Sequence, residues 1–378
     1  MRHLDCNQPP WRRWIHLSAL VLLLEGARCA ALAAGDLGQY IARSWQTEDG
    51  LPHNYVLAVM HGRDDYLWVG TRSGLARFDG IRFTPMDWGL IKGLGVICLC
   101  EGNDGSLWVG LEGNGVLRWD GRTLARYTHT NGLNSSFVRA IHPGRDGSIW
   151  IATRAGLTRW RQGTCDTFSR EEGLASPLVE ALCEDPQGHL WVGTAEGLNC
   201  FKDGAVAATL TVRDGLPANS VTALCTDHDG NLWIGTSEGL VVRRAGKIHT
   251  AYNEANGLTE RFIRTLYEDR QGNLWIGTYG GLYRTVSNTP DGTALPGWGR
   301  CVPQWNTQGV AYDRVMSIVE DPEGSLWVGS RDGLSRLRVR PFAGLGKPQG
   351  LSQNIATAVC EDADGALWIT RFLLGSVN

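Results

Sequence analysis

The sequence lacks several features that would assign it to a common class of protein. No apolar run reaches the ~18 residues that a membrane-spanning helix needs, and there is no collagen-like period or Pro-rich tract. The formal net charge is −3 over 378 residues, and Lys and Arg form no cluster, whereas nucleic-acid-binding proteins usually carry a basic face. We therefore expect no membrane span in this chain and no nucleic-acid partner.

Catalytic signatures are also scarce. The chain contains no HExxH, Walker or CxxC motif. Its histidines share no position of the repeat described below, as shown by His53, His61, His129, His142, His189, His228 and His249. We expect no cofactor, no metal site and no enzymatic activity. The alternative is a lyase or hydrolase acting on a polysaccharide or similar polar substrate, because a fold does not fix function.

Two residue types are in excess. Gly occurs 49 times and Trp 16 times, while Met occurs only 4 times. Since no single tract holds the surplus Gly, these residues must lie in turns. The hydrophobic content of 43% is ordinary and excludes disorder of the whole chain. Together these counts predict short strands, tight turns and repetition.

One sequence pattern occurs eight times, each time around a tryptophan. The spacings are 40, 42, 41, 42, 42, 52 and 41 residues between Trp68, Trp108, Trp150, Trp191, Trp233, Trp275, Trp327 and Trp368. A Gly lies 18 residues before seven of these and 19 before Trp108, namely Gly50, Gly89, Gly132, Gly173, Gly215, Gly257, Gly309 and Gly350. Such a fixed period indicates a repeat architecture.

Each unit can be interpreted as four short strands. In the first unit, Val56 and the small residue Ala58 lie 12 and 10 positions before the Trp, which predicts a first strand buried on both faces. A turn follows, usually Asp-Gly, which favours a two-residue hairpin. Leu67–Thr71 then predicts the second strand and Gly74–Arg77 the third. A weaker fourth strand, such as Lys247–Tyr252, completes the unit.

Four antiparallel strands in about 42 residues make one blade of a β-propeller. The sequence therefore predicts an all-β fold, a seven-bladed β-propeller of four-stranded antiparallel blades with an incomplete eighth repeat at the C-terminus. The Trp side chains would fill the wedges between blades. Tyr40–Trp45 would supply the outer strand that closes the ring. The 52-residue spacing predicts a longer loop or hairpin near Val286–Asn306 in the sixth blade.

The N-terminal residues 1–34 read as a signal peptide. Arg2, Arg12 and Arg13 precede the short apolar stretch Trp14–Leu24, and Ala31–Ala33 fits a cleavage site. A buried N-terminal helix is the alternative. Removing this segment, whose charges sum to +2, would leave a mature net charge near −5. We expect the propeller over 35–345 and the incomplete further repeat, the truncated start of a second propeller, over 346–378.

The complete units resemble the two-component regulator propeller repeat. The shared pattern is VxALxEDxxGxLWIGTxxGLxR, and Ser44–Pro52 is similar to the usual start of such sensor regions. The resemblance covers about Gln39 to Thr370. It implies an extracytoplasmic sensor region of bacterial hybrid two-component or diguanylate cyclase-type signalling proteins, in which membrane and output domains follow. No sandwich domain, membrane helix or output domain is found in these 378 residues.

The cysteines and the turn carboxylates are interpreted as structural. Four cysteines share the position eight before the Trp, which favours core packing over disulfides or a redox pair: Cys100, Cys183, Cys225 and Cys360. Five aspartates recur six before the Trp and are typical of turns rather than of a calcium loop: Asp185, Asp227, Asp269, Asp321 and Asp362.

We predict a ligand site on one face of the ring, where two sets of loops meet. The first set precedes each inner strand and presents Asn54, Asn219, Arg261 and Asp313. The second set joins the second strand to the third and presents Arg72, Glu112, Arg154, Glu196, Glu238, Tyr279 and Arg331. Charges, amides and an aromatic residue around a funnel suit a polar small molecule or oligosaccharide, with a protein partner as the alternative.

These observations lead to one functional hypothesis. We expect a periplasmic or secreted, non-enzymatic propeller that senses or binds a ligand for a two-component-type signalling system and lacks its own output domain. A propeller that serves as a scaffold for a separate membrane sensor kinase is the other alternative to the enzyme. Association with a membrane sensor protein would fit either role.

Overall fold

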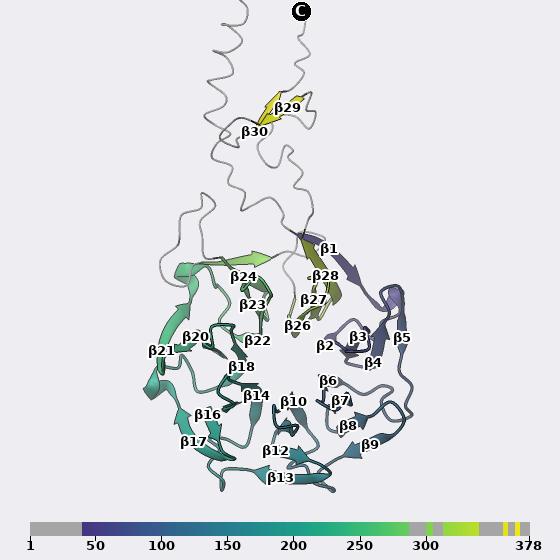
Figure 1. The fold of residues 1–378 in the computed structure, drawn as a ribbon, viewed down its shortest axis with the longest axis vertical. Coiled ribbons are helices and arrows are strands. Elements are labelled where there is room, and N and C mark those ends of the chain that lie inside the picture. The colour runs from purple at the N-terminus through teal and green to yellow at the C-terminus, as the bar shows by residue number, and fades with distance from the viewer. Residues whose placement is uncertain (1–39, 287–299, 305–312, 340–357, 362–366, 371–378) are drawn as a thin grey trace, which may run out of the picture. The chain divides into compact units, whose positions relative to one another are not determined.

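Strands form here because each repeat alternates short runs of Val, Ile, Leu and Trp with turns that contain Gly. The computed structural model of the protein describes residues 40–286, 300–304, 313–339, 358–361 and 367–370. Within these ranges it contains seven four-stranded antiparallel sheets, the blades, arranged in a ring with their first strands innermost (Figure 1). The predicted all-β, seven-bladed propeller is thus confirmed.

The blades have nearly equal strands, named in order from the innermost outward. Blade 1 consists of β2 (Val56–His61), β3 (Leu67–Thr71), β4 (Gly74–Phe78) and β5 (Phe83–Pro85), and blade 2 of β6 (Val96–Glu101), β7 (Leu107–Leu111), β8 (Gly115–Trp119) and β9 (Leu124–Tyr127). Blade 3 consists of β10 (Val138–Pro143), β11 (Ile149–Thr153), β12 (Gly156–Arg161) and β13 (Thr164–Phe168), and blade 4 of β14 (Val179–Glu184), β15 (Leu190–Thr194), β16 (Gly197–Lys202) and β17 (Ala205–Leu210).

Blades 5 to 7 follow the same order. Blade 5 consists of β18 (Val221–Thr226), β19 (Leu232–Thr236), β20 (Gly239–Arg244) and β21 (Lys247–Tyr252), and blade 6 of β22 (Ile263–Glu268), β23 (Leu274–Thr278), β24 (Leu282–Val286) and β25 (Arg300–Gln304). Blade 7 consists of β26 (Ser317–Glu320), β27 (Leu326–Ser330) and β28 (Gly333–Val339), with β1 (Tyr40–Trp45) as its outer strand. Three single-turn 3-10 helices follow outer strands: η1 (Thr47–Asp49), η2 (Val212–Asp214) and η3 (Glu254–Asn256).

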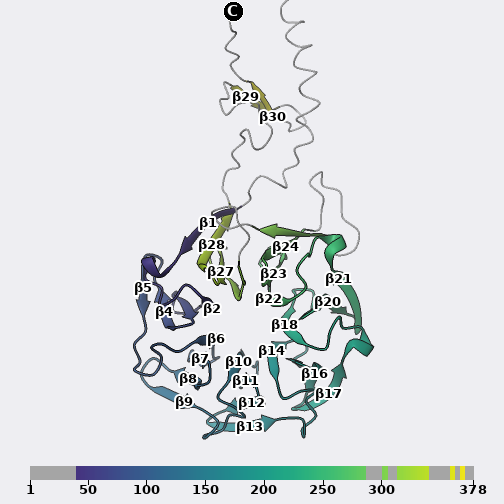
Figure 2. The same cartoon turned by 180° about the vertical axis from the view of Figure 1, so that it is seen from behind.

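The ring closes as predicted, with the N-terminal strand in the last blade. β1 pairs antiparallel with β28, from Tyr40 opposite Val339 to Trp45 opposite Leu334, and the two strands lie side by side in Figure 2. The Trp45 ring stacks on Trp327 of the same blade, with 5.2 Å between ring centroids. It also meets Phe78 of blade 1 edge-on at 5.4 Å. Blades 7 and 1 are thereby joined.

The core consists of seven clusters in the described ring, each between two neighbouring blades. Trp233 of blade 5, for example, packs with Leu274 and Ile276 of blade 6. In six of the seven blades the residue two positions after the Trp is Gly, with Ala152 in blade 3. This Gly allows the close approach, because a Cβ on Gly235 would lie 2.5 Å from Ile263 of the next blade. The Trp residues therefore fill the wedges between blades, as predicted.

Two local predictions need correction. Every residue of the second strand is buried, whereas the first strand has partly exposed positions such as Leu57, because one side of it faces the centre of the ring. The turn between these strands is also longer than a two-residue hairpin. Between β6 and β7 it spans residues 102–106, the Gly105 N–H donates to the Gly102 carbonyl, and Gly105 has φ 77°. The chain thus forms a hairpin built around a tight turn that ends in a left-handed residue.

The turn aspartates hold the tryptophans in place. Asp269 is buried, and its Oδ2 accepts a hydrogen bond of 2.7 Å from the Trp275 indole N–H. Its Oδ1 accepts backbone hydrogen bonds from Gln271 and Asn273. Asp185, Asp227 and Asp321 make the same contact with their own Trp. The prediction of a structural role is confirmed for these four residues.

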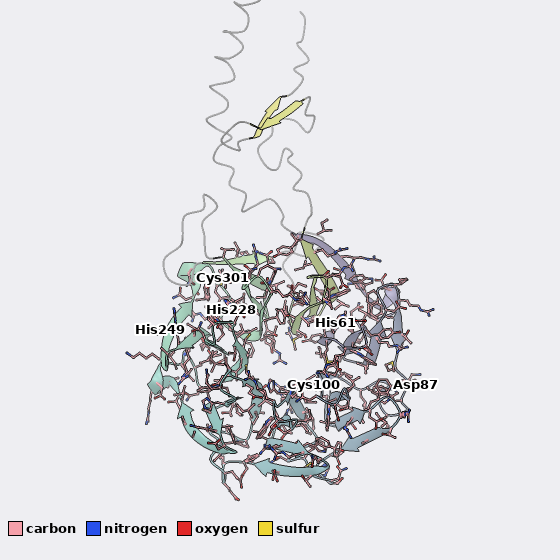
Figure 3. All side chains as sticks on the ribbon, in the orientation of Figure 1. His61, Asp87, Cys100, His228, His249 and Cys301 are labelled. Atoms are coloured by element: carbon pink, nitrogen blue, oxygen red, sulfur yellow. The ribbon has the colours of Figure 1, made fainter. Side chains whose placement is uncertain are left out.

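The cysteines of the ring are unpaired, as predicted. The described side chains include seven free thiols: Cys98, Cys100, Cys165, Cys183, Cys200, Cys225 and Cys301. Cys100 packs beside Trp108 in the cluster between blades 2 and 3. Figure 3 shows Cys100 and Cys301 on separate blades.

The repeat continues after the ring. β29 (Ala358–Glu361) and β30 (Leu367–Thr370) pair with Cys360 opposite Trp368, the register of the first two strands of a blade. The long connection predicted for the sixth blade joins β24 to β25, which are paired. The predicted signal peptide over 1–34, the boundary at 345/346 and Asp362 lie outside the described residues. No helix in the described ranges is long and apolar enough to cross a membrane.

Removal of Trp45 should open the ring. We expect Trp45→Ala to lower the free energy of unfolding by about 3–5 kcal/mol, because a large side chain that is 3% exposed is lost from the contact between blades 7 and 1. Urea denaturation of the full chain measures this. Ile41→Ala on the same strand is the control, since Ile41 is 50% exposed. Equal losses for both variants would contradict the proposed closure.

Removal of a turn aspartate should also destabilise the fold. Asp269→Ala leaves the Trp275 N–H and two backbone N–H groups without their acceptor, and we expect a loss of about 1–3 kcal/mol. Asp229→Ala is the control because the Asp229 side chain is 70% exposed in the turn of blade 5. We expect it to change stability by less than about 0.5 kcal/mol. Thermal unfolding of both variants tests the difference.

Candidate functional site

The eleven predicted site residues all lie in loops on one face of the ring, because antiparallel strands bring these two sets of loops to the same edge of each blade. Eight of them are exposed: Arg72, Glu112, Arg154, Glu196, Glu238, Arg261, Tyr279 and Arg331. Asn54, Asn219 and Asp313 are partly buried. We call this loop face the mouth.

Two predicted residues serve the fold of the mouth. The Asn54 side-chain oxygen accepts a hydrogen bond of 2.7 Å from the Thr47 N–H. The Asn219 oxygen accepts one of 2.9 Å from the Val212 N–H. Both contacts hold the turn that leads from an outer strand to the next inner strand. These two side-chain oxygens therefore stabilise the turns and already accept a hydrogen bond within the protein.

Several charged residues of the mouth pair with one another. Arg261 lies 3.2 Å from Glu254 and 3.9 Å from Glu238 of the preceding blade. Arg331 lies 3.3 Å from Asp313. Glu196 pairs with Arg170. Arg72, Glu112 and Arg154 make no hydrogen bond or ion pair with a side chain that the structure describes, and the Arg154 guanidinium lies 5.0 Å from the Phe137 ring. Arg72 and Glu112 are therefore charged groups of the mouth that remain available.

Two aromatic residues of the mouth, Phe137 and Phe262, were missed in the sequence, whereas Tyr279 was predicted. Tyr279 stacks on Phe262, with 4.6 Å between ring centroids and 11° between the planes. The Arg314 guanidinium lies 5.3 Å from the Tyr279 ring, and Arg314 itself has φ 50°, a left-handed conformation that is uncommon for this residue type. Phe137 and Phe262 both lie 13 positions before a Trp. That shared register was the signal that could have revealed them.

A cavity of about 210 Å³ lies among the inner strands; we call it the channel. Its wall includes the residue 11 positions before the Trp of each of the seven blades. In blades 1 to 6 the antiparallel register shifts at this residue, which is the mark of a β-bulge. The bulge takes the residue out of the pairing and aims its side chain away from the regular pleat.

The channel wall has two chemically different halves. Blades 7, 1 and 2 contribute apolar side chains from Met316, Leu57 and Ile97. Blades 3 to 6 contribute polar ones from Arg139, Glu180, Thr222 and Arg264. Because the blades follow one another around the ring, each set forms a continuous arc.

The two channel arginines differ in their partners. Arg139 donates to Glu180 through Nε, at 2.9 Å, and through Nη2. Arg264 makes no hydrogen bond or ion pair with any group in the described ranges. Burial lowers the pKa of the Arg264 guanidinium, and the neighbouring positive charge of Arg139 lowers it further. The pair and the lone arginine together give the channel a net charge of +1.

Thiols and histidines form no reactive group in the part of the chain that is described. Burial raises the pKa of Cys98 to about 12, which disfavours the thiolate that a redox pair or metal site requires. Burial lowers the pKa of His142 to about 4. His61 lies on blade 1, whereas His228 and His249 lie on blade 5 (Figure 3). No cluster of three or more metal-ligating side chains occurs in these ranges.

The repeats match a known family of sequences. The family described as "Two component regulator propeller" matches residues 50–73, 132–155, 173–196, 215–238, 257–280 and 309–332. Each match begins at the Gly 18 positions before a Trp and ends in the loop after the second strand. A search of curated protein sequences gives no match.

Solved structures with this fold come from proteins of different roles. The extracellular domain of BT3049, assigned to a hybrid two-component system of B. thetaiotaomicron, has a TM-score of 0.67 and 20% identity over 79% of this chain and 41% of that one. Virginiamycin B lyase from Staphylococcus aureus with quinupristin has a TM-score of 0.62 and 13% identity, covering 80% and 100%. PorZ of the Porphyromonas gingivalis type-IX secretion system has a TM-score of 0.53 and 16% identity, covering 78% and 47%.

These comparisons support the fold and identify its repeats. The chain spans about two fifths of the BT3049 domain, and identities of this size show a common fold without a common function. The repeat matches are more specific, since six of them recur in register with the blades. The chain therefore belongs to the two-component regulator propeller repeat family.

Proposed function

We propose that this chain is the ligand-binding propeller of a two-component-type sensor. The observation that carries the proposal is the contrast between framework and mouth. The buried positions repeat almost unchanged from blade to blade, whereas the loops that converge on one face present charges, amides and aromatics that differ in each blade. Concave sites with a few converging polar groups are where small ligands bind.

A polar small molecule or an oligosaccharide fits the mouth best. Arg72 and Glu112 offer a hydrogen-bond donor and an acceptor without partners in the described ranges, and both are exposed. The Phe262–Tyr279 stack offers an aromatic surface on which the apolar face of a sugar ring can pack. Residues of both kinds on one face favour a ligand that is polar at its edges and flat.

An extracytoplasmic location fits this role. The sequence of residues 1–34 has the charge and apolar pattern of an exported protein. The BT3049 structure is an extracellular domain. We propose that the propeller works in the periplasm or after secretion. It would pass its signal to another domain or to a membrane sensor protein.

An enzyme is the second candidate, because virginiamycin B lyase shares the fold. One contact at the mouth favours it, namely that of His129 Nδ1 with Ser136 Oγ at 3.0 Å. The Ser136 oxygen also accepts from the His129 N–H, as Asn54 and Asn219 do in their turns, so a structural role explains this contact. Gly235–Gly239 matches GxSxG, but it joins two strands and not a strand to a helix.

The binding function can be tested with the full chain and a panel of neutral and acidic oligosaccharides. Isothermal titration calorimetry should find a ligand, and the triple variant Arg72→Ser/Glu112→Gln/Tyr279→Ala should bind it at least about 10-fold more weakly. The control is Arg82→Gln/Arg122→Gln, in the hairpins between third and fourth strands on the opposite face. Unchanged affinity in the triple variant would rule out the mouth as the site.

The enzyme and the scaffold are distinguished by two further measurements, product formation from the same panel and co-purification. Product formation that Ser136→Ala abolishes would favour the enzyme. Co-purification with a membrane sensor kinase, without any small ligand, would favour the scaffold.

A further inference from the structure

We propose that the channel binds a small organic anion with an apolar body. Its carboxylate, or a similar oxyanion, would lie between Arg264 and Arg139, and its apolar part would lie against Leu57, Ile97 and Met316. This inference rests on the proposal that the chain binds ligands, but it concerns a site separate from the mouth. The experiments below distinguish the two.

Arg264 is the strongest indication of an absent anion. Arginines that a protein encloses are usually paired with carboxylates, because an unpaired buried charge is costly. Arg264 comes from the bulge of blade 6 and lines the channel, yet it has no acidic partner in the described ranges. A structural role would not require this arrangement, since blades 1, 2 and 7 place uncharged Leu57, Ile97 and Met316 at the same position.

Arg139 and Glu180 complete the polar half of the site. Both donors of Arg139 reach the same Glu180 oxygen, Oε2, so Arg139 Nη1 keeps free hydrogens for a second acceptor. The hydroxyl of Thr222 donates to the Ile263 carbonyl at 2.5 Å and therefore has no proton to offer. Two guanidinium groups against one carboxylate leave one positive charge for the ligand to neutralise, and a partly enclosed site strengthens that attraction.

The apolar half and the size of the channel restrict the ligand. A cavity of about 150 Å³ can hold benzene, so about 210 Å³ accommodates a compact monocarboxylate. An inorganic oxyanion would satisfy the arginines but would leave the apolar arc of Leu57, Ile97 and Met316 facing water. We therefore expect affinity to rise with the apolar size of the anion.

The probes are acetate, butyrate and benzoate, with inorganic phosphate and sulfate for comparison. Ligand-observed NMR and calorimetry on the full chain should give affinities in the order benzoate, butyrate, acetate, with phosphate and sulfate weaker than butyrate. Tight binding of phosphate or sulfate alone would overturn the assignment of an organic anion. Binding of none of the five would overturn the site.

Substitution of Arg264 separates binding from folding. Arg264→Met should weaken benzoate binding by about 10- to 100-fold, because charge-assisted hydrogen bonds are lost. It should leave the unfolding temperature of the free protein unchanged or higher, since it removes an enclosed charge. Arg82→Gln, an exposed arginine on the opposite face, is the matched control. If Arg264→Met still binds benzoate as tightly as the unmodified chain, the proposed anion site is wrong. A lower unfolding temperature in that variant would further show that the arginine is structural.

A second variant predicts the opposite change and so covers the case in which Arg264→Met does not fold. Glu180→Gln removes the only carboxylate of the described channel wall and releases Arg139. We expect benzoate to bind severalfold more tightly, with a steeper salt dependence. Weaker or unchanged binding would contradict the proposal. If the unmodified chain binds none of the carboxylates but still binds an oligosaccharide at the mouth, this inference is overturned and the proposed function stands.

Discussion

The packing of each tryptophan against the next blade is the contact on which the structure depends. A single blade exposes apolar side chains on both faces, so it is stable only when a neighbour covers each face. In a row of blades the two ends would stay uncovered, and seven such contacts in a ring remove both ends. The N-terminal strand β1 belongs to the sheet of blade 7, and the chain continues from it into blade 1, so the first and last blades are held together. This explains why Trp45, Trp327 and Phe78 pack together at that joint.

This contact also determines which positions can vary. Six glycines meet the Val or Ile that lies 12 positions before the Trp of the next blade, as Gly70 meets Val96. In five blades a turn carboxylate accepts a hydrogen bond from the indole N–H. The carboxylate can come from either of two positions. In blade 6 it is Asp269, whereas in blade 1 Gly62 stands there and Asp64 reaches Trp68 from two residues later. A Cβ on Gly62 would lie 2.3 Å from the Asp64 oxygen, so the two arrangements exclude each other there. In blade 2 the Trp108 indole donates instead to the Ser106 hydroxyl, which in turn donates to Asp104. The bulged residue of the inner strand takes no part in these contacts and is therefore free to differ.

The sequence predicts the framework well because each framework position is repeated. The strands, the ring closure and the structural role of Asp269 all follow from residues that recur at fixed offsets from a Trp. The bulge could not be predicted, because a register shift depends on how two strands pair and leaves no fixed residue type behind. Arg139 and Arg264 were therefore not predicted as site residues. Asn54 and Asn219 were predicted to face a ligand, yet their oxygens hold turns, a role that only the backbone around them reveals.

The difference between the mouth and the channel is mainly one of solvent. Charges such as Arg261 and Glu238 are exposed, so water and salt screen them and their net contribution to binding is small. Arg264 is only partly exposed and lies among the inner strands, where a charge interacts more strongly with an anion than it does at the mouth. A ligand at the mouth can therefore gain specificity from many loops, whereas an anion in the channel would gain affinity from a few groups. Since Arg139 and Arg264 lie on the inner strands of different blades, an anion between them would connect blade 3 to blade 6 across the ring. Such a contact would stiffen the ring against opening, which is the kind of change that a sensor can pass on to a partner.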